Sequence, residues 1–427
     1  MGPRTTARDR HGPPGAGVGP GRDTTSWGAV LSLMAAGVVG AAQIGKGSAA
    51  LPVLQDEFLL SSSGAAWFLS VVSAIGAVAG ALLGWLGQAL GFRRQVLLGL
   101  LAIVLANLGG AAATSAGWLL TARVGEGFGF VLVVLAAPGL LPEVAAPEHR
   151  RLVIGAWGIY MPLGAGLATL LVPLAITVLN WRSAWLLDAG VTAAVLLAVA
   201  RWVPSGPARR PQGMGGLLGA FRSPGVLCLA VVFGLYAGQY LAVVGLLPTM
   251  LVDGGLSLRA AGLVTGIVFL ANVPANLLGA FLLHRGVSRW LLIVAGSGWI
   301  AATVWAVHAP DLPLSVRIGS VVAYSLVVGI VPSALFSGVV AMSAGTASAG
   351  AAVGLLMQGS SVGQLLGPPL VVAVGSGVSS WTGRPAALAC LAAGVLAGGL
   401  LYRRLDKPLA PRPGGHDRSS DGRYSDC

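Results

Sequence analysis

Charged side chains are scarce in this chain of 427 residues, because Asp, Glu, Lys and Arg together make up only 9% of it. A soluble domain carries about a quarter charged residues. Hydrophobic residues reach 55%, and the mean hydropathy is +0.82. The chain therefore has too little polar surface to face water along most of its length, and lipid is its predicted surrounding.

Cysteine and histidine are also scarce. The three cysteines are too few and too dispersed for a disulfide framework or a metal site. The five histidines fall in predicted tails, loops or span ends, and the spans hold few acids. No glycine run resembles a phosphate-binding loop. These features argue against a metal, a nucleotide cofactor and an enzyme, which would need several converging His, Asp or Ser groups.

Twelve apolar runs are each long enough to cross a bilayer, which takes about 20 mostly apolar residues. The sequence therefore predicts an all-α integral membrane protein with twelve transmembrane helices. The runs fall near residues 28–51, 65–86, 96–115, 118–141, 152–178, 184–203, 225–247, 260–283, 290–308, 315–342, 350–375 and 384–402.

The longest polar break, residues 204–224, divides these runs six and six and is predicted to be a cytoplasmic linker. The predicted domains are therefore two six-helix bundles, 26–203 and 225–403. Residues 1–25 are rich in Pro, Gly and Arg and lack the apolar centre of a signal peptide. Together with the polar segment 404–427, they are predicted to be disordered cytoplasmic tails.

The two halves resemble each other at an offset near 195 residues. "ALLGWLGQALGFRR" (81–94) pairs with "NLLGAFLLHRGVSR" (276–289), and residues 122–138 pair with 316–332. Further matches follow in the same order, so the halves are predicted to be pseudo-symmetric. Two like halves with a solute site between them, near the middle of the membrane, are typical of secondary transporters.

The net charge of +12 could suggest a nucleic-acid partner, but its distribution argues against one. Of the 26 basic residues, 20 fall in segments predicted to be cytoplasmic. This asymmetry follows the positive-inside rule and predicts that both termini are cytoplasmic and that the arginines meet anionic lipid headgroups. The exceptions, in spans or outer loops, are Lys46, Arg123, Arg182, Arg259, Arg317 and Arg384.

The loop between the second and third spans carries a family motif. In the major facilitator superfamily this loop reads roughly G-x-x-x-D-R-x-G-R-R, and here it is "GWLGQALGFRR", with Gly84, Gly91, Arg93 and Arg94 in place. The chain resembles this superfamily over about 26–403. Gln88 stands where the family has an acid, so the resemblance implies the fold and alternating access but not the acid-based latch of this gating loop.

Two further patterns support the resemblance. The fourth span contains "RVGEGFG", which matches the family pattern R-x-x-x-G-x-G at Arg123, Gly127 and Gly129. The run "WGIYMPLG" (157–164), followed by "WRSAW" (181–185), is similar to members of the cyanate-permease type. Most members of the superfamily act as monomers, so the resemblance implies a monomer here.

Charged residues inside the spans are the first candidates for a site, because ionisable groups in a membrane usually face the bundle interior or a water-filled cavity. Lys46 lies six residues before Pro52 and Glu126 eight after Trp118, which places them roughly 9 and 12 Å from the outer face at ~1.5 Å per residue. Arg123 shares a helix face with Glu126. A Lys46–Glu126 or Arg123–Glu126 pair is therefore geometrically reasonable.

In the functional interpretation, Lys46 and Arg123 attract an anionic solute, while Glu126 balances charge and is the candidate for a coupling proton. In the alternative, Arg123 and Glu126 only brace helices or lie in a wet outer vestibule. Asp188 is expected to be a structural or outer-end group.

Seven other residues are candidate solute contacts. Gln43 and Gln239 occupy equivalent repeat positions, so they could contact one ligand from opposite sides. The alternative for the amides is interhelical hydrogen bonding, and for the aromatic residues it is packing. The seven residues are Gln43, Trp157, Tyr160, Gln239, Tyr240, Arg317 and Gln358.

The sequence therefore predicts a secondary active transporter of the bacterial cytoplasmic membrane. Its expected cargo is a small polar solute, an anion or weak acid such as cyanate or a small carboxylate, with proton coupling through Glu126 as a hypothesis. The alternative within the superfamily is an efflux carrier for drugs or other hydrophobic compounds. The alternative of another class is a non-transporting receptor or sensor, which normally brings a folded output domain.

Overall fold

The computed structural model describes residues 24–205, 214–309, 311–343, 349–377 and 380–405, and within these ranges every regular element is a helix. The predicted tails and much of the predicted linker lie outside the described residues. The N-terminal half contains α1 (Trp27–Phe58), α2 (Ser62–Ser70), the 3₁₀ turn η1 (Val71–Ser73), α3 (Ala74–Leu90), α4 (Phe92–Ala111), α5 (Ala116–Val144), α6 (Arg150–Trp157), α7 (Tyr160–Val178) and α8 (Trp181–Trp202).

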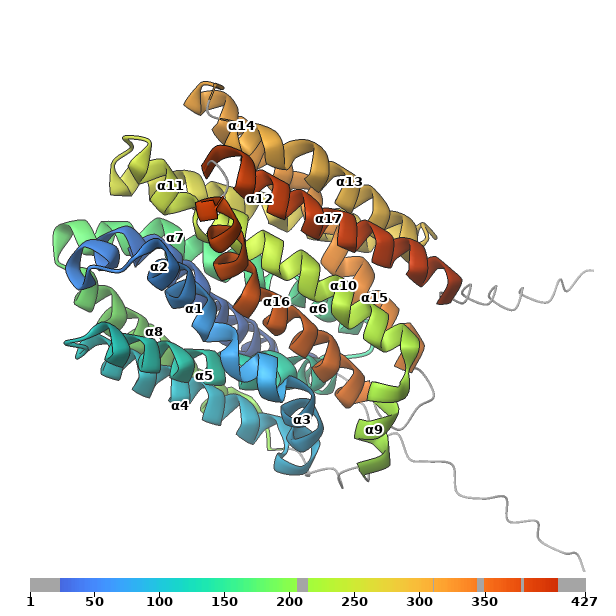
Figure 1. Ribbon diagram of the computed structural model, residues 1–427. Helices are drawn as coiled ribbons and strands as arrows, with labels where there is room; N and C mark the ends of the chain where they lie inside the picture. The colour runs from blue at the N-terminus through green and yellow to red at the C-terminus, as the bar shows by residue number, and fades with distance from the viewer. Residues whose placement is uncertain (1–23, 206–213, 310, 344–348, 378–379, 406–427) are drawn as a thin grey trace, which may run out of the picture.

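The C-terminal half follows after α9 (Met214–Arg222), a short helix within the predicted linker. Figure 1 shows it beside the ends of α10 and α16. The remaining elements are α10 (Pro224–Tyr240), the π-helical turn η2 (Leu241–Gly245), α11 (Leu247–Asp253), α12 (Leu258–His284), α13 (Arg289–His308), α14 (Leu314–Val328), α15 (Ile330–Ser343), α16 (Ala349–Gly377) and α17 (Ser380–Leu405).

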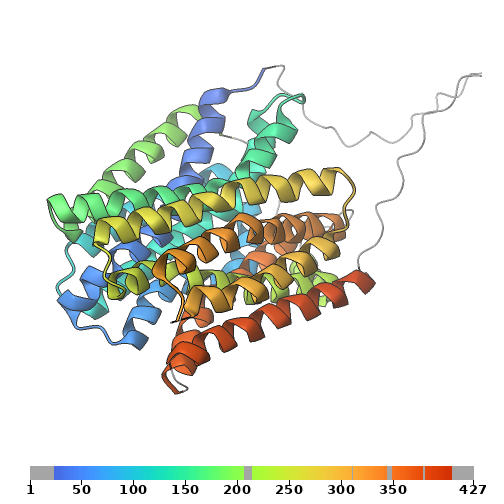
Figure 2. The ribbon, with the colours of Figure 1, turned by 90° about the horizontal axis from the view of Figure 1, so that it is seen from above.

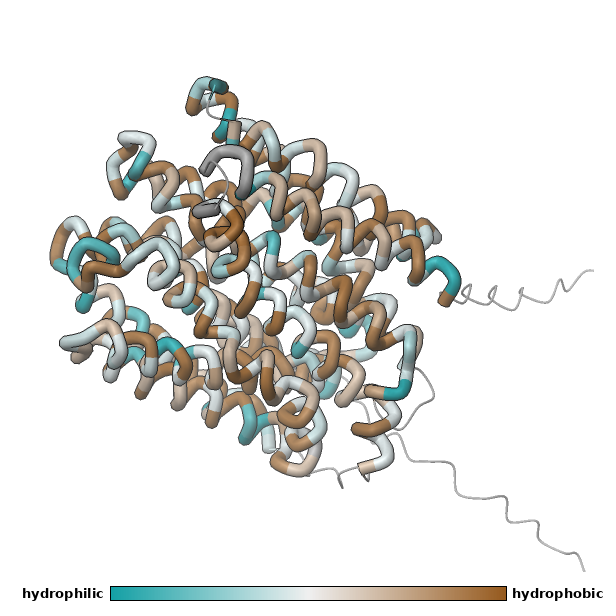
Figure 3. Tube along the Cα trace, in the orientation of Figure 1, coloured by the Kyte–Doolittle hydropathy of each residue, from teal (hydrophilic) through white to brown (hydrophobic). Residues whose placement is uncertain are grey.

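All twelve predicted apolar runs correspond to helices. Among the described residues, eleven helical stretches are long and apolar enough to cross a membrane. The remaining run is α16, which has 29 residues. Its composition is less apolar because it contains Gln358, Gln364, several Ser and Gly, and a Pro pair at 368 and 369. Figure 3 shows hydrophobic residues along most of the helix lengths and hydrophilic ones mostly near the helix ends.

Four of the runs are broken within their length. The second is interrupted by the 3₁₀ turn η1, which separates α2 from α3. The fifth divides into α6 and α7 around Gly158, and the tenth divides into α14 and α15 at Gly329. In the seventh, the π-helical turn η2 separates α10 from α11. Breaks of this kind release backbone groups from the regular helical pattern, and π-helical turns are frequent at functional sites. The seventh span can therefore bend between its two helical parts.

The helices run side by side in one bundle, seen from two directions in Figures 1 and 2. The largest buried hydrophobic cluster consists mainly of residues from the C-terminal half, while two further clusters lie within the N-terminal half. Each half therefore has a core of its own.

Three contacts between helical elements join the two halves. α3 packs on α16, α7 packs on α12, and α1 reaches η2. At the first contact, a Cβ added to Gly84 would lie 3.0 Å from the Gly350 oxygen, so the backbones themselves touch. At the third, the Ser48 hydroxyl donates to the Gly245 carbonyl over 2.7 Å. Because that carbonyl belongs to η2, the irregular turn of the seventh span is tied directly to α1.

Candidate functional site

Lys46 lies inside the N-terminal half and is 1% exposed. Its Nζ lies 3.0 Å from Glu126 Oε1 on α5 and 3.0 Å from Asp188 Oδ2 on α8. It also donates to Gln43 Oε1 over 2.7 Å and to Asn107 Oδ1 on α4. One ammonium group thus joins four helices, and it faces protein rather than lipid.

Glu126 is held from several sides. Arg123, one turn earlier on α5, donates through Nη1 to Glu126 Oε2, and the same Nη1 donates to the Gln43 carbonyl over 2.7 Å. The Trp185 ring nitrogen donates to Glu126 Oε1 over 2.9 Å. Arg123 and Glu126 are both 0% exposed. The Arg123–Glu126 pair that their spacing predicts is present, and it is joined to Lys46.

Lys46, Arg123, Glu126 and Asp188 form a charge cluster with two positive and two negative side chains. Gln43 completes it, because its amide nitrogen donates to Asp188 Oδ2 over 2.8 Å. With all four groups ionised, the net charge is zero. Since an unpaired buried charge is expensive in a low-dielectric interior, this balance explains how so many ionised groups can lie inside a membrane helix bundle.

Small residues make room for the cluster. A Cβ on Gly47 would lie 2.6 Å from Arg123 Nη2, and one on Gly110 would lie 2.6 Å from the Trp185 ring. The rings also cover the cations, with Lys46 Nζ 4.7 Å from the Trp185 ring centre and Arg123 Cζ 5.2 Å from that of Phe68. Such contacts add cation–π attraction to the ion pairs.

Asn107 and Trp185 were not among the residues predicted to form a site, and Asp188 was assigned to a structural or outer-end role. The sequence does indicate how far Asp188 lies from the outer face of the membrane. It lies seven residues after Trp181, where α8 begins, and therefore about 10 Å along the helix at ~1.5 Å per residue. This depth matches that of Lys46 and Glu126. Asn107 offers a weaker signal, since an isolated amide in a span commonly hydrogen-bonds a neighbouring helix.

Arg317 and Gln358 lie apart from the charge cluster. Arg317 donates to the Val307 carbonyl over 3.0 Å and contacts the Met250 sulfur at 3.4 Å. Gln358 donates to the Ala77 carbonyl over 2.9 Å and accepts from another backbone amide of α3. It therefore ties α16 to α3 across the two halves.

Trp157 and Tyr160 stack on each other at the break between α6 and α7. Their ring centres are 4.5 Å apart with 26° between the planes. Tyr160 is buried with Ala41 and Val134, and Met357 of the C-terminal half packs against this group. The pair thus lies at the contact between the halves and away from the charge cluster.

Gln239 and Tyr240 lie in the C-terminal half, at the end of α10. Tyr240 stacks at 6.1 Å on Tyr236 and at 6.3 Å on Tyr324. Gln239 is 0% exposed, and neither atom of its amide has a hydrogen-bond partner among the described residues. Gln43, its repeat equivalent, has both amide atoms hydrogen-bonded, including to Lys46 and Asp188 of the charge cluster. The two amides therefore have different surroundings despite their matching positions.

One part of the contact between the halves is apolar. Ile44, Val72 and Leu241 are buried together, with Phe130 and Met161 packed against them. Ile44 is two residues from Lys46 on α1, so it faces another side of that helix. One helix thus presents a charged face to the N-terminal half and an apolar face to the C-terminal half.

The gating-loop motif is built mainly from backbone contacts. Gly91 has φ +82°, a conformation that favours glycine, and it allows the tight turn from α3 into α4. Arg93 then donates to the carbonyls of Val203 and Ala200, over 2.7 and 2.8 Å, at the end of α8. Arg94 is exposed, and the Gln88 side chain lies outside the described residues.

Arg93→Ala is expected to destabilise the protein, because it removes donors from two carbonyls at the end of a helix. The expected loss of unfolding free energy is about 1 kcal/mol. Thermal unfolding of the purified protein checks this, with Arg94→Ala as the matched control because that side chain is exposed. Equal midpoints for the two variants would contradict this role for Arg93.

Paired helical halves with a buried ion cluster are features of a membrane transport protein, and the sequence comparison names its family. Residues 30–368 match the model of the Major Facilitator Superfamily, so the chain belongs to this family. This membership confirms the predicted superfamily, its all-α fold and a transport role rather than an enzymatic one.

Known transporters resemble the chain over different lengths. The arabinose-proton symporter of Escherichia coli K12 is 34% identical over 183 residues, which covers 42% of this chain but only 38% of the symporter. Human monocarboxylate transporter 11 is 29% identical over 344 residues, covering 75% of this chain and 71% of that protein. The 2-nitroimidazole transporter of Escherichia coli K12 is 28% identical over 276 residues, covering 61% and 66%.

The fold is shared with a solved structure. The crystal structure of a D-xylose-proton symporter superposes with a TM-score of 0.73 over 90% of this chain and 98% of the symporter. The sequences are 16% identical in that comparison, so the similarity concerns the fold alone.

Proposed function

We propose that the protein is a proton-coupled secondary transporter of a small organic anion, such as a monocarboxylate or a comparable weak acid. The observation that carries this proposal is the electroneutral charge cluster around Lys46. The same proposal places both termini of a monomeric protein in the cytoplasm of a bacterium, in accord with the distribution of arginine.

Charge balance is the reason to couple an anion to a proton. The cluster already pairs two cations with two carboxylates, so an anion that entered alone would leave one negative charge without a partner. Such a charge costs several kcal/mol in a low-dielectric interior. A proton that arrives with the anion neutralises one carboxylate and leaves a cation for the solute, which keeps the site neutral throughout.

Asp188 is the carboxylate that a proton can reach with the least disturbance. Its side chain is 14% exposed, whereas that of Glu126 is 0% exposed. Asp188 is paired with Lys46 alone, while Glu126 is paired with Lys46 and Arg123. In our proposal, protonated Asp188 releases Lys46 to the solute. Glu126, the candidate from sequence, then keeps Arg123 in place.

Arg123 provides a second donor for the solute. Its Nε and Nη2 have no hydrogen-bond partner among the described residues, while Nη1 is occupied by Glu126 and the Gln43 carbonyl. A guanidinium edge with two parallel donors fits a carboxylate in a bidentate arrangement. The relatives support this chemistry, since they include proton symporters of sugars and a monocarboxylate transporter.

The apolar contact between the halves favours a second candidate function. Ile44, Leu241 and their neighbours offer apolar surface where the solute of a secondary transporter is expected to bind, and one relative is a 2-nitroimidazole transporter. The second candidate is therefore a carrier of weakly polar aromatic compounds.

Uptake into proteoliposomes distinguishes the two candidates. Labelled acetate, lactate, cyanate and 2-nitroimidazole are offered with and without an inward proton gradient. The wild type is expected to accumulate an anion only with the gradient. Asp188→Asn is expected to lose accumulation but to keep exchange of internal for external anion, because exchange needs no net proton transfer.

Asp253→Asn is the matched control, since Asp253 is exposed at the end of α11. Accumulation by Asp188→Asn at the wild-type level would contradict the role of Asp188. Transport of 2-nitroimidazole but of no anion by the wild type would replace the first candidate with the second.

A further inference from the structure

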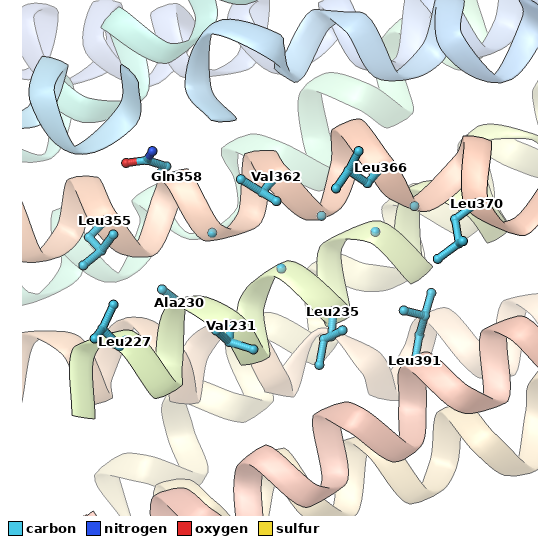
Figure 4. Close-up of a pocket in the computed structure, with 15 residues that line it drawn as sticks. Leu227, Ala230, Val231, Leu235, Leu355, Gln358, Val362, Leu366, Leu370 and Leu391 are labelled. Atoms are coloured by element: carbon cyan, nitrogen blue, oxygen red, sulfur yellow. The ribbon is translucent and has the colours of Figure 1, made fainter. Parts of the chain in front are cut away.

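A groove of about 460 Å³ lies in the C-terminal half between α10, α16 and α17, away from the charge cluster. Figure 4 shows its lining side chains, which come mainly from α10 and α16, with Leu391 from α17. Nearly all of its lining residues are apolar. They include Leu227, Val231, Leu355, Val362, Leu366 and Leu370.

Close contact between the α10 and α16 backbones explains the groove. A Cβ on Gly363 would lie 1.7 Å from the Gly234 oxygen, and one on Gly367 would lie 2.5 Å from Gly238. Glycines at the crossing leave no side chains to fill the space beside it. The larger residues Val231 and Val362 stand on its borders, 62% and 39% exposed.

The polar amide of Gln358 is turned out of the groove. It is hydrogen-bonded to the α3 backbone at Ala77 and Ala81, and Figure 4 shows the side chain directed away from α10. The surface inside the groove is consequently apolar, and an occupant without polar groups fits it.

The groove is longer than the hydrocarbon depth of one leaflet, so it can hold a whole acyl chain. Leu355 and Leu370 are 15 residues apart on α16, or about 22 Å at ~1.5 Å per residue. One leaflet of a bilayer contributes about half of a ~30 Å hydrocarbon core. An acyl chain that enters at Leu227 and Leu355 can therefore lie within the groove over the whole length of the chain.

The charge at this end of the groove favours an anionic headgroup. Arg222 is exposed at the end of α9, directly before α10 begins, and Arg404 is exposed in the last turn of α17. α17 runs antiparallel to α10, with Cys228 Sγ 3.6 Å from the Gly398 oxygen, so Arg404 lies near the start of α10. The sequences of α9, α10, α16 and α17 contain no Asp or Glu.

We propose that this groove binds an acyl chain of an anionic phospholipid whose headgroup meets Arg222 and Arg404. The site is independent of the transported solute, because none of its residues belongs to the charge cluster. Its occupant enters from the bilayer, where α10 and α16 expose Val231 and Leu366.

Native mass spectrometry of the full chain tests the proposal, with phosphatidylglycerol and phosphatidylcholine of equal chain length added to the micelles. Val362→Trp fills the groove and is expected to lower retention of both lipids more than about tenfold, because each buried methylene contributes ~0.8 kcal/mol. Val191→Trp is the matched control, since Val191 is 56% exposed on α8, outside the groove.

Arg222→Gln and Arg404→Gln are each expected to reduce the preference for phosphatidylglycerol about fivefold, at ~1 kcal/mol per arginine near an anionic surface. Retention of phosphatidylcholine is expected to stay unchanged in both. Arg201→Gln serves as the control, because it removes an exposed arginine from the end of α8.

Two results would overturn the proposal. One is equal lipid retention by Val362→Trp and Val191→Trp. The other is loss of 2-nitroimidazole uptake in Val362→Trp without any change in bound lipid, which would make the groove an entry path for apolar solutes.

Discussion

Lys46→Met is expected to abolish transport and to lower the free energy of unfolding by about 3–5 kcal/mol. The variant leaves Glu126 and Asp188 with a single cation, Arg123, so that one buried carboxylate has no ionic partner. It also removes the ammonium group that donates to Gln43 and Asn107. Thermal unfolding in detergent and uptake into proteoliposomes measure the two effects separately.

A second substitution separates structure from function. Lys46→Met combined with Asp188→Asn restores neutrality, with Arg123 against Glu126. We expect the double variant to regain most of the lost stability, because the unpaired charge is gone. We expect it to be inactive even in anion exchange, which Asp188→Asn alone keeps, because the proposed solute contact of Lys46 is missing. Arg201→Met, which replaces an exposed arginine of α8, controls for the introduced methionine.

The possible outcomes point to different roles. If the double variant transports like the wild type, Lys46 only balances charge and makes no essential contact with the solute. If Lys46→Met is as stable as the wild type, the ion pairs at 3.0 Å contribute little, and our account of the charge cluster fails.

Gly127→Ala is expected to be one of the most disruptive single-methyl changes among the described residues. A Cβ at this position would lie 1.7 Å from the Val72 carbonyl oxygen and 2.6 Å from its carbon. The obstacle is backbone at the η1 turn, which cannot rotate away as a side chain could. We expect a loss of about 3 kcal/mol or more in unfolding free energy, at the upper end of overpacking effects.

Gly109→Ala is the matched control on the neighbouring helix α4. No atom lies within 4 Å of its added Cβ, and alanine favours a helix over glycine by about 1 kcal/mol, so this variant is expected to be as stable as the wild type or slightly more so. Thermal unfolding and size-exclusion profiles compare the two. A Gly127→Ala protein that unfolds at the wild-type midpoint would show that α5 and η1 can separate at low cost.

This contact also gives a physical reason for the R-x-x-x-G-x-G pattern. Gly127 faces the Val72 carbonyl, while a Cβ on Gly129 would lie 2.3 Å from the Gly99 oxygen. The two glycines therefore let α5 approach two neighbours at once. Sequence alone revealed the pattern, but it could not reveal which backbones would meet there.

The spans and halves were predictable because they depend on local hydropathy and on the internal repeat. Lys46, Arg123 and Glu126 were found for a similar reason, since charges in apolar runs are conspicuous. The contribution of Asn107 and Trp185 depends on how α4 and α8 are rotated about their axes. Rotation is set by packing across the whole bundle, which the hydropathy pattern of a buried helix does not specify.

The repeat also has a limit as a guide to sites. It placed Gln43 and Gln239 in equivalent positions, yet Gln43 contacts Lys46 and Asp188, whereas Gln239 lies near the π-helical turn of the seventh span. The first span has no counterpart of this turn, because α1 continues unbroken through Pro52. Equal positions in a repeat thus share a place in the fold without sharing a chemical environment.

The neutrality of the charge cluster has a consequence for energetics across an energised membrane. Moving one elementary charge through the membrane potential involves about 2.3 kcal/mol per 100 mV. The four side chains carry no net charge, so the return of the empty carrier involves almost no electrical work. The proposed complex with one anion and one proton is neutral as well. In the proposed mechanism, voltage therefore leaves both reorientation steps nearly unchanged, and the concentration gradients of anion and proton alone set the direction of transport.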